Sequence, residues 1–389
     1  MPMDHLQFSD FDNETLYNLA HGYQYGNGPE CDWPLAVEIY RELMRRGYGP
    51  GFYGLGNCYR YGHGLRRDKQ QANLHYLQAA GYGCAEAMAA LAASFQYGFG
   101  VRENACMAFG LYTAAAAAGS AEGQYALAKC YLDGFGTGKD PEQAVYWFTQ
   151  AAQQGMPQAM YRLACCSADG LGMPESLAAA EDWCYHAIHN GMPYAQYLRD
   201  ALSLCDPVAN SDADRAAQIA DELHWMAEEG NLLAKRLLAN CYLQGIGVEQ
   251  DPALAIEMLK QVAAQSSKPA MRMLAECYQY GFGVCPDLQQ AVFWYSQAVA
   301  LGDSTAMRLL AELYLDGIDG EPMPDPALQL YEQAAALDDA EAAYLLAEHY
   351  LNGTFPCDPE TTREKAQLLL QQAARSGHGD AAFRLSQLS

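Results

Sequence analysis

Residues 120–155 read SAEGQYALAKCYLDGFGTGKDPEQAVYWFTQAAQQG, and this stretch decides the fold. In both of its halves, apolar or small residues recur every three to four positions, which predicts two amphipathic helices. Gly134 and Gly136 lie between the halves and supply the positive-φ conformations that end a helix. Asp140 and Pro141 then form a helix-start signal, because an Asp side chain accepts from free backbone N–H groups and Pro loses no hydrogen bond there. The stretch therefore predicts helix A, a tight turn and helix B.

This unit recurs in steps of 36 residues on either side of one irregular segment. The second turn glycine is found at Gly64, Gly100, Gly136, Gly172, Gly247 and Gly283. A single hairpin cannot bury both of its helices, so stacked copies are needed to form a continuous core. We expect about ten helix-turn-helix repeats over residues 14–377, after a flexible leader over residues 1–13. Residues 378–389 should form a C-terminal capping helix.

The repeated pattern resembles the Sel1-like repeat family, which is related to the tetratricopeptide repeat. It reads A-x-A-x-Y-x-L-A/G-x-x-Y-x-x-G-x-G followed by A-x-x-W/Y-Y/F-x-x-A-A-x-x-G, and copies cover nearly the whole chain. The resemblance implies an all-α, right-handed superhelical solenoid. It also implies an adaptor, regulator or scaffold that holds peptides or other proteins and has no catalytic activity.

The sixth repeat, residues 192–230, departs from the pattern. It is 39 residues long, and its turn reads LCDPVANSDAD without the two glycines. We expect a change in superhelical curvature or a flexible joint at this repeat.

The chain is strongly acidic, with a formal net charge of −24. Residues 201–389 contain 27 Asp or Glu against 11 Lys or Arg, whereas residues 1–70 contain 9 against 7. Such a chain repels phosphate backbones, so we expect no nucleic-acid partner. Two interpretations stay open: the acidic half binds a basic protein surface, or the charge keeps a long exposed solenoid in solution.

The 13 cysteines do not form a disulfide pattern. Five occupy one column just before the helix A tyrosine, where cysteine serves as a small packing residue: Cys58, Cys130, Cys166, Cys241 and Cys277. The resemblance implies one disulfide per repeat in secreted relatives, but alanines stand at the ends of helix B here. With an odd count, no signal segment and no apolar run long enough to cross a membrane, we expect a cytoplasmic protein.

By analogy with the tetratricopeptide repeat, helix A lines the concave face of the solenoid. The positions two before and two after its consensus leucine should point inward, and we call them the first and second columns. The first column contains Tyr53, Ala89, Tyr125, Tyr161, Tyr197, Arg236, Arg272, Arg308 and Tyr344. The second column contains Asn57, Ala93, Lys129, Cys165, Asn240, Glu276, Glu312 and Glu348. These columns are the candidate surface for a protein or an extended peptide.

The three first-column arginines have two interpretations. Arg236, Arg272 and Arg308 lie in consecutive repeats, and forked donors of this kind suit carboxylates on an extended acidic peptide. However, Glu276 and Glu312 follow two of these arginines by four residues, so each pair can instead neutralise itself on one helix face.

Two further sets of residues also have two interpretations. Tyrosines at the turn after helix A either contact a partner or pack within the repeat: Tyr61, Tyr97 and Tyr280. One basic cluster either supports head-to-tail association with the acidic half of another copy or is simply solvated: Arg41, Arg45, Arg46, Arg60, Arg66, Arg67 and Lys69. The sequence leaves the oligomeric state open.

We expect no catalytic residue, cofactor or metal. His186 and His189 lie three residues apart without an acidic or cysteine ligand beside them. Asp212 and Asp214 lack the glycine and glutamate of a calcium loop. Adjacent Cys165 and Cys166 lack redox spacing, and a Ser-x-x-Lys signature is missing.

The sequence therefore predicts a non-enzymatic scaffold or adaptor. An alternative is an acidic, immunity-type inhibitor that neutralises a basic toxin or enzyme, since Sel1-like proteins occur in such bacterial roles. A hydrolase is the third and weakest alternative.

Overall fold

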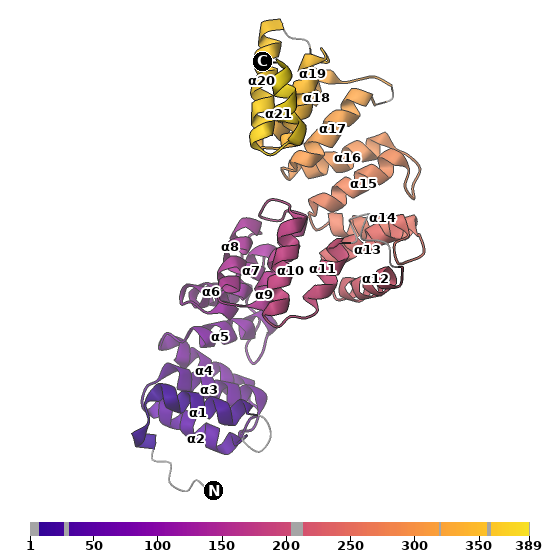
Figure 1. The fold of residues 1–389 in the computed structure, drawn as a ribbon. Coiled ribbons are helices and arrows are strands. Elements are labelled where there is room, and N and C mark those ends of the chain that lie inside the picture. Colours follow the sequence, from indigo (N-terminus) through magenta and orange to yellow (C-terminus); the bar gives the residue numbers. More distant parts are fainter. Residues whose placement is uncertain (1–7, 27–30, 204–212, 319, 356–358, 389) are drawn as a thin grey trace. The chain divides into compact units, whose positions relative to one another are not determined.

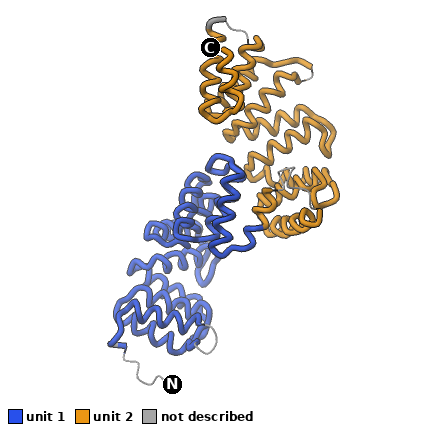
Figure 2. Tube along the Cα trace, viewed as in Figure 1, with its two compact units in different colours: residues 1–196 blue, residues 197–389 orange. Residues whose placement is uncertain are grey.

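The computed structural model describes residues 8–26, 31–203, 213–318, 320–355 and 359–388. Within these ranges the regular structure is helical, apart from an isolated β-bridge between Ile318 and Glu321. The chain divides into two compact units, residues 1–196 and 197–389 (Figure 2).

The first unit consists of helix pairs that follow the chain (Figure 1). Its elements are η1 (Phe8–Asp10), α1 (Asn13–Tyr25), α2 (Trp33–Arg45), α3 (Gly49–Tyr61), α4 (Lys69–Gly81), α5 (Ala85–Tyr97), α6 (Ala105–Ala117), α7 (Ala121–Asp133), α8 (Pro141–Gln153), α9 (Pro157–Asp169) and α10 (Leu177–His189). Odd-numbered helices are helix A and even-numbered helices are helix B. Each helix packs against the next along the chain.

The elements of the second unit are α11 (Ala195–Ser203), which begins just before the boundary, α12 (Ala213–Glu228), α13 (Leu232–Gln244), α14 (Pro252–Ala263), α15 (Lys268–Tyr280), α16 (Leu288–Ala300), α17 (Ser304–Asp316), α18 (Pro324–Ala336), α19 (Ala340–Leu351), α20 (Pro359–Arg375) and α21 (Gly379–Leu388). In this unit the helices from α12 onward repeat the arrangement of the first unit, each packing against the next along the chain. The predicted all-α solenoid of helix pairs is confirmed. The handedness of its superhelix stays a prediction.

Helix boundaries follow the predicted start and stop signals. Gly134 ends α7 in the left-handed conformation, with φ of 76°. The Asp140 side chain accepts from the backbone N–H of Gln143 and so caps α8, whose first residue is Pro141. Each half of a repeat is thus delimited by local chemistry.

The second turn glycine sets the distance between neighbouring repeats. Gly136 has φ of +72°, and a Cβ built on it would lie 2.4 Å from the carbonyl oxygen of Ala105, the first residue of α6. Gly172 lies in the same way against Pro141 at the start of α8, with a corresponding distance of 2.2 Å. The turn of one repeat therefore rests directly on the backbone at the start of the preceding helix B, and only glycine fits.

Replacing this glycine should be far more costly than replacing a glycine with the same conformation in open space. Gly119 also has positive φ, but a Cβ there would meet no atom within 4 Å. Gly119→Ala should lower the free energy of unfolding by about 1 kcal/mol, the strain of the left-handed conformation. Gly136→Ala should lower it by about 2–4 kcal/mol, because two repeats must also shift apart. Calorimetric melting of both variants tests this, and equal losses would contradict the stacking role.

A buried tyrosine links helix B to helix A within several repeats. The hydroxyl of Tyr40 in α2 donates to Oε1 of Gln24 in α1 at 2.9 Å. The pairs Tyr112–Gln96 and Tyr295–Gln279 repeat this bond at 2.7 and 3.1 Å. The tyrosine always follows the glutamine by 16 residues, so the bond satisfies a buried hydroxyl at an equivalent place in each of these repeats.

The repeat formed by α17 and α18 has the helix B tyrosine but lacks this bond. Leu315 occupies the position of the glutamine there, and the hydroxyl of Tyr331 is buried without a hydrogen-bond partner. A buried polar group without a partner is destabilising.

The two kinds of repeat should respond differently to loss of the hydroxyl. Tyr40→Phe should lower the free energy of unfolding by about 1 kcal/mol, because Gln24 loses a buried partner. Tyr331→Phe should leave the free energy unchanged or raise it slightly, because the hydroxyl it removes makes no bond. Chemical denaturation of the two variants checks the difference, and a similar loss in both would refute it.

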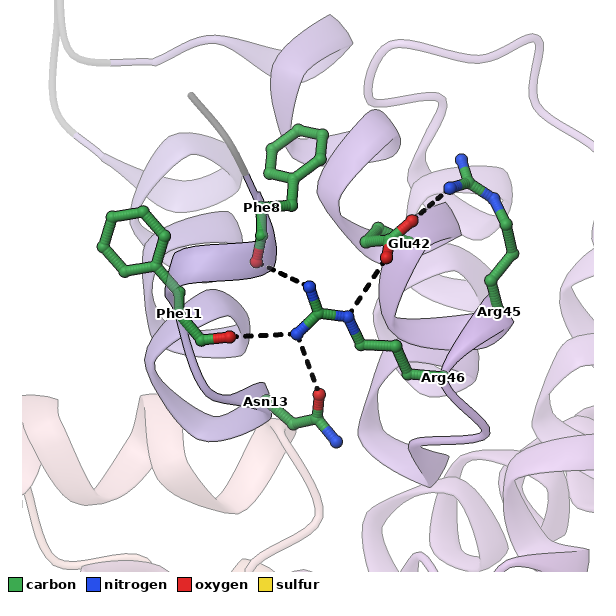
Figure 3. A network of polar contacts seen from close by, with 6 residues as sticks. All are labelled: Phe8, Phe11, Asn13, Glu42, Arg45 and Arg46. Carbon is green, nitrogen blue, oxygen red and sulfur yellow. Dashed lines mark hydrogen bonds and ion pairs between the residues drawn. The ribbon is translucent and has the colours of Figure 1, made fainter. Parts of the chain in front are cut away.

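Residues 8–13, the described part of the predicted leader, are tied to the end of α2 (Figure 3). The guanidinium of Arg46 donates to the backbone oxygens of Phe8 and Phe11 at 2.5 and 2.9 Å. It also donates to Oε1 of Glu42 at 3.1 Å and lies 3.4 Å from Oδ1 of Asn13. The predicted leader over residues 1–7 lies outside the described residues.

The predicted C-terminal capping helix and the irregular sixth repeat are described next. At the C-terminus α21 packs on α20, and Arg363 and Gln367 donate to the backbone oxygen of Leu388.

In the sixth repeat, α11 has 9 residues and α12 has 16, against 13 in most helices. The turn between them, residues 204–212, lies outside the described residues, so the predicted joint stays a prediction.

Candidate binding surface

The first-column tyrosines of the first unit are partly buried against helix B. The ring centroid of Tyr53 lies 5.8 Å from that of Tyr76, and Tyr125 lies 5.6 Å from Phe148. Tyr161 makes an edge contact with Tyr194 at 5.9 Å. Burial raises the pKa of Tyr161, so its phenol stays neutral at physiological pH. These rings are held in place by packing while part of each remains accessible.

Two polar second-column residues of the first unit, Asn57 and Lys129, have different environments. Asn57 is only 8% exposed, and its Oδ1 accepts from the hydroxyl of Tyr76 at 2.7 Å. Asn57 therefore contributes to the interior of its repeat. Lys129 on α7 is partly exposed, and no carboxylate among the described residues forms an ion pair with it.

Arg272 connects two successive repeats of the second unit. Its Nη1 forms an ion pair with the carboxylate of Asp303, and the two side chains are 14% and 4% exposed. Asp303 also caps α17 by accepting from the backbone N–H of Ala306 at 3.0 Å. The pKa of Glu276 is raised by burial, and the opposing effect of the neighbouring Arg272 is smaller. Arg272 is thus engaged inside the solenoid.

The other two first-column arginines are also engaged or buried. Arg308 donates to Oε1 of Glu312 at 3.0 Å, which confirms the expected pairing at a spacing of four residues. Arg236 on α13 is only 8% exposed. The geometry favours self-neutralisation for Arg308, whereas binding of a ligand by the arginine column stays a prediction.

The last position of each column contacts the C-terminal helix or the residues just before it. The ring of Tyr344 stacks on His378 at 4.2 Å. Glu348 in the second column accepts from Nε and Nη2 of Arg384 on α21 at 2.5 and 3.1 Å. Elsewhere in this unit, Oδ1 of Asn240 accepts from Gln244 at 3.0 Å and Tyr197 is partly exposed.

The two equivalent arginines should differ strongly in their effect on stability. Arg272→Met should lower the free energy of unfolding by about 3 kcal/mol, because it leaves the buried carboxylate of Asp303 without its cation. Arg308→Met should cost less than about 1 kcal/mol, because Glu312 is 40% exposed and can be hydrated. Thermal melting of the matched pair measures the difference, and equal effects would contradict this account.

The turn tyrosines are exposed. Tyr61, Tyr97 and Tyr280 are 53%, 53% and 62% exposed. Each lies beside the ring of His63, Phe99 or Phe282, two residues later, at 5.6–6.0 Å. These rings are therefore outside the buried core of their repeats, and contact with a partner stays a prediction.

The basic cluster separates into two groups in space. Arg45 and Arg46 both pair with Glu42, whereas Arg60, Arg67 and Lys69 line a cavity of about 180 Å³ in the first unit. The remaining lining residues are Tyr61, Ala72, Asn73, Ser94 and Phe99. The sequence analysis identified the cations but missed Asn73, Ser94 and Phe99; comparison of equivalent positions between repeats could have found them.

The residues considered for catalysis are not assembled into a site in the described part of the chain. Nδ1 of His189 lies 2.8 Å from the backbone oxygen of Tyr185, and no cluster of His, Cys, Asp or Glu with metal-ligand geometry occurs among the described residues. Burial raises the pKa of both Cys165 and Cys166 to about 12, so both are protonated thiols at neutral pH. Asp212 lies outside the described residues.

No helix in the described ranges combines the length and apolarity that a membrane crossing requires.

The family model described as Sel1 repeat matches the chain nine times. The matched segments are residues 14–41, 53–81, 85–120, 121–156, 157–192, 232–267, 268–303, 304–339 and 340–378. The unmatched gap after residue 192 coincides with the irregular sixth repeat.

Several solved structures are similar to the chain, whereas no curated protein sequence matches it. A protective antigen of uropathogenic Escherichia coli with an SLR fold is 25% identical, with a TM-score of 0.42; the match covers 98% of this chain and 72% of the antigen. A Sel1 repeat protein from Oxalobacter formigenes is 23% identical, with a TM-score of 0.32 and coverage of 77% and 96%. An immunity protein from Pseudomonas aeruginosa is 19% identical, with a TM-score of 0.30 and coverage of 66% and 83%. At these TM-scores the structures carry no argument about function.

Proposed function

Because the chain belongs to the Sel1 repeat family, we propose that it is a non-enzymatic scaffold that binds a protein or an extended peptide across its helix A columns. The observation that supports this most is the row of first-column tyrosines in the first unit: Tyr53, Tyr125 and Tyr161. Packing already fixes their rings, so a partner that contacts them orders little that was free before.

The charges of the two units support binding mainly through the first unit. Lys129 lies next to the tyrosine row and has no ion pair among the described residues. In the second unit, Arg272 and Arg308 are already neutralised by Asp303 and Glu312. A partner would have to displace those bonds before it could use the arginines, whereas Lys129 is available without such a cost.

The proposed compartment is the cytoplasm. Cys58, Cys130 and Cys277 are buried at equivalent positions of helix A, where they pack as small apolar residues. Thiols used in this way suit a reducing environment.

A second candidate is an immunity-type or inhibitor protein that neutralises a basic toxin or enzyme. It is supported by the concentration of negative charge in residues 201–389 and by the exposure of carboxylates there. The side chains of Glu228 and Glu341, for example, are 70% and 51% exposed. Opposite charge on a partner would speed association and make it sensitive to salt.

Charge reversal at Lys129 tests the scaffold proposal. Tagged protein is used to capture partners from its native lysate, in the parent and in Lys129→Glu. Loss of the uncompensated cation should lower recovery of the specific partner at least about fivefold, because a like charge would then face the partner's acidic groups. Quantitative mass spectrometry measures the recovery.

Lys139→Glu is the matched control. It makes the same charge change in the exposed turn after α7, away from both columns, and should leave recovery unchanged. Equal recovery in all three proteins would exclude the columns of the first unit. A partner that binds one to one, with an association rate that falls steeply with salt, would establish the neutraliser instead. Turnover by the purified protein alone would refute the non-enzymatic role.

A further inference from the structure

The cavity in the first unit lies where the second repeat meets the third, and residues of α3, α4 and α5 and of the turns that follow α3 and α5 line it. Its volume of about 180 Å³ is room for roughly six water molecules. Arg60 comes from the end of α3, Arg67 from the turn and Lys69 from the start of α4. A chain with a net charge of −24 thus gathers three cations around one small cavity.

The cations converge on aromatic rings. The guanidinium carbon of Arg60 lies 5.5 Å from the ring centroid of Tyr61 and 5.9 Å from that of Phe99. Nζ of Lys69 lies 4.8 Å from the Phe99 centroid. Nε of Arg67 donates to the backbone oxygen of Arg60 at 3.0 Å, which orients its guanidinium. The cation–π contacts stabilise the cations without neutralising them.

No carboxylate in the described ranges forms an ion pair with any of the three cations. The one acidic residue beside them in sequence, Asp68, is engaged elsewhere. Its Oδ1 accepts from the backbone N–H groups of Gln70 and Gln71 at 2.9 and 3.0 Å and so caps α4. The positive charge of the cavity is therefore uncompensated.

Comparison with other junctions of the same chain shows how the cavity arises. The position of Asn73 is apolar 36 residues away on either side, where Val37 and Phe109 stand. The position of Ser94 is cysteine in neighbouring repeats, as in Cys58 and Cys130. Arg60 stands where other repeats have the glutamine that pairs with the helix B tyrosine: Gln24, Gln96 and Gln279.

These three departures do not improve the packing of the junction. Asn73 and Ser94 are only 6% and 3% exposed, and each places a polar group where other repeats have a less polar one. Both side chains donate to backbone oxygens: Nδ2 of Asn73 to that of Phe99 at 2.6 Å, and Oγ of Ser94 to that of Ala90 at 3.1 Å. The result is a rigid, polar floor beneath three cations.

We propose that this cavity binds an oxyanion carried by a side chain of a protein partner, either the carboxylate of an acidic residue or a phosphate. The assignment rests on the proposed scaffold function and names the chemistry that one of its sites recognises. Forked and ammonium donors around a polar floor suit an oxyanion. Tyr61 lines the cavity, and the ring of Tyr97 lies 5.6 Å from that of the lining Phe99. Both tyrosines are more than half exposed and would contact an apolar neighbour of the anionic residue.

Three capped peptides test the proposal by isothermal titration calorimetry: acetyl-Gly-Glu-Phe-Gly-amide, its phosphoserine analogue and its glutamine analogue. At least one anionic peptide should bind saturably to the full chain and at least tenfold more tightly than the glutamine peptide. The tighter of the two anionic peptides identifies the source of the oxyanion. If neither binds more tightly than the glutamine peptide, the proposal is wrong.

A double variant supplies the decisive comparison. Arg60→Gln with Asn73→Val gives the junction residues that the chain itself uses elsewhere, so the variant should fold with an equal or higher melting temperature. It should bind the anionic peptide at least tenfold more weakly. Arg102→Gln, which removes an exposed cation outside the cavity, should bind like the parent.

If the double variant binds as the parent does, the cavity is not the site. This outcome is independent of the capture experiment with Lys129→Glu, because the peptides are defined and need no native partner. Failure of the helix A proposal alone would leave binding of the peptides intact.

Discussion

The structure depends on the close approach of the glycine-containing turns to the backbone of the preceding repeat, as in six of the described turns: those with Gly64, Gly100, Gly136, Gly172, Gly247 and Gly283. The second turn glycine lies against the first residues of helix B, at a distance that leaves no space for a methyl group, as at Gly136 and Gly172. A contact of this kind fixes both the spacing and the phase of neighbouring hairpins. The columns of residues at equivalent positions therefore exist in space as well as in the sequence.

Charged groups have two roles in this protein. Pairs such as Arg272 with Asp303 and Glu348 with Arg384 join successive helices and are part of the solenoid. Lys129 and the cations of the cavity have no such pairing among the described residues. Cations that no carboxylate neutralises suit interaction with an acidic group of another molecule. On this basis the first unit is the better candidate for recognition.

Most of the fold could be predicted from the sequence, because its signals are local. The turn glycines and the Asp140 cap act within a few residues, so periodicity was enough to place the helices. Side-chain partners were harder to predict. The bond between Arg272 and Asp303 joins residues 31 positions apart, and its formation depends on how helices of different repeats cross.

The candidate site shows the same limit. The sequence placed Arg60, Arg67 and Lys69 in one basic cluster together with Arg45 and Arg46, but the structure assigns the two groups to different surroundings. The buried floor of the cavity was not predicted. The sequence alone does not show which residues surround an Asn in a helix, so it does not indicate that Asn73 lines a cavity. The difference between Asn73 and the equivalent Val37 and Phe109 indicates a polar junction only once the structure shows that these positions are equivalent in space.

The regularity of the repeats also has a consequence for protein engineering. The junctions between repeats have nearly the same backbone but different side chains. A residue found at one junction is therefore a compatible substitution at the equivalent position of another. The cavity arises from Arg60, Asn73 and Ser94, three side chains on a backbone that the other repeats share. Substituting these residues can therefore remove the cavity without changing the fold. Recognition can thus be transplanted, duplicated or erased at one junction while the architecture of its neighbours is preserved.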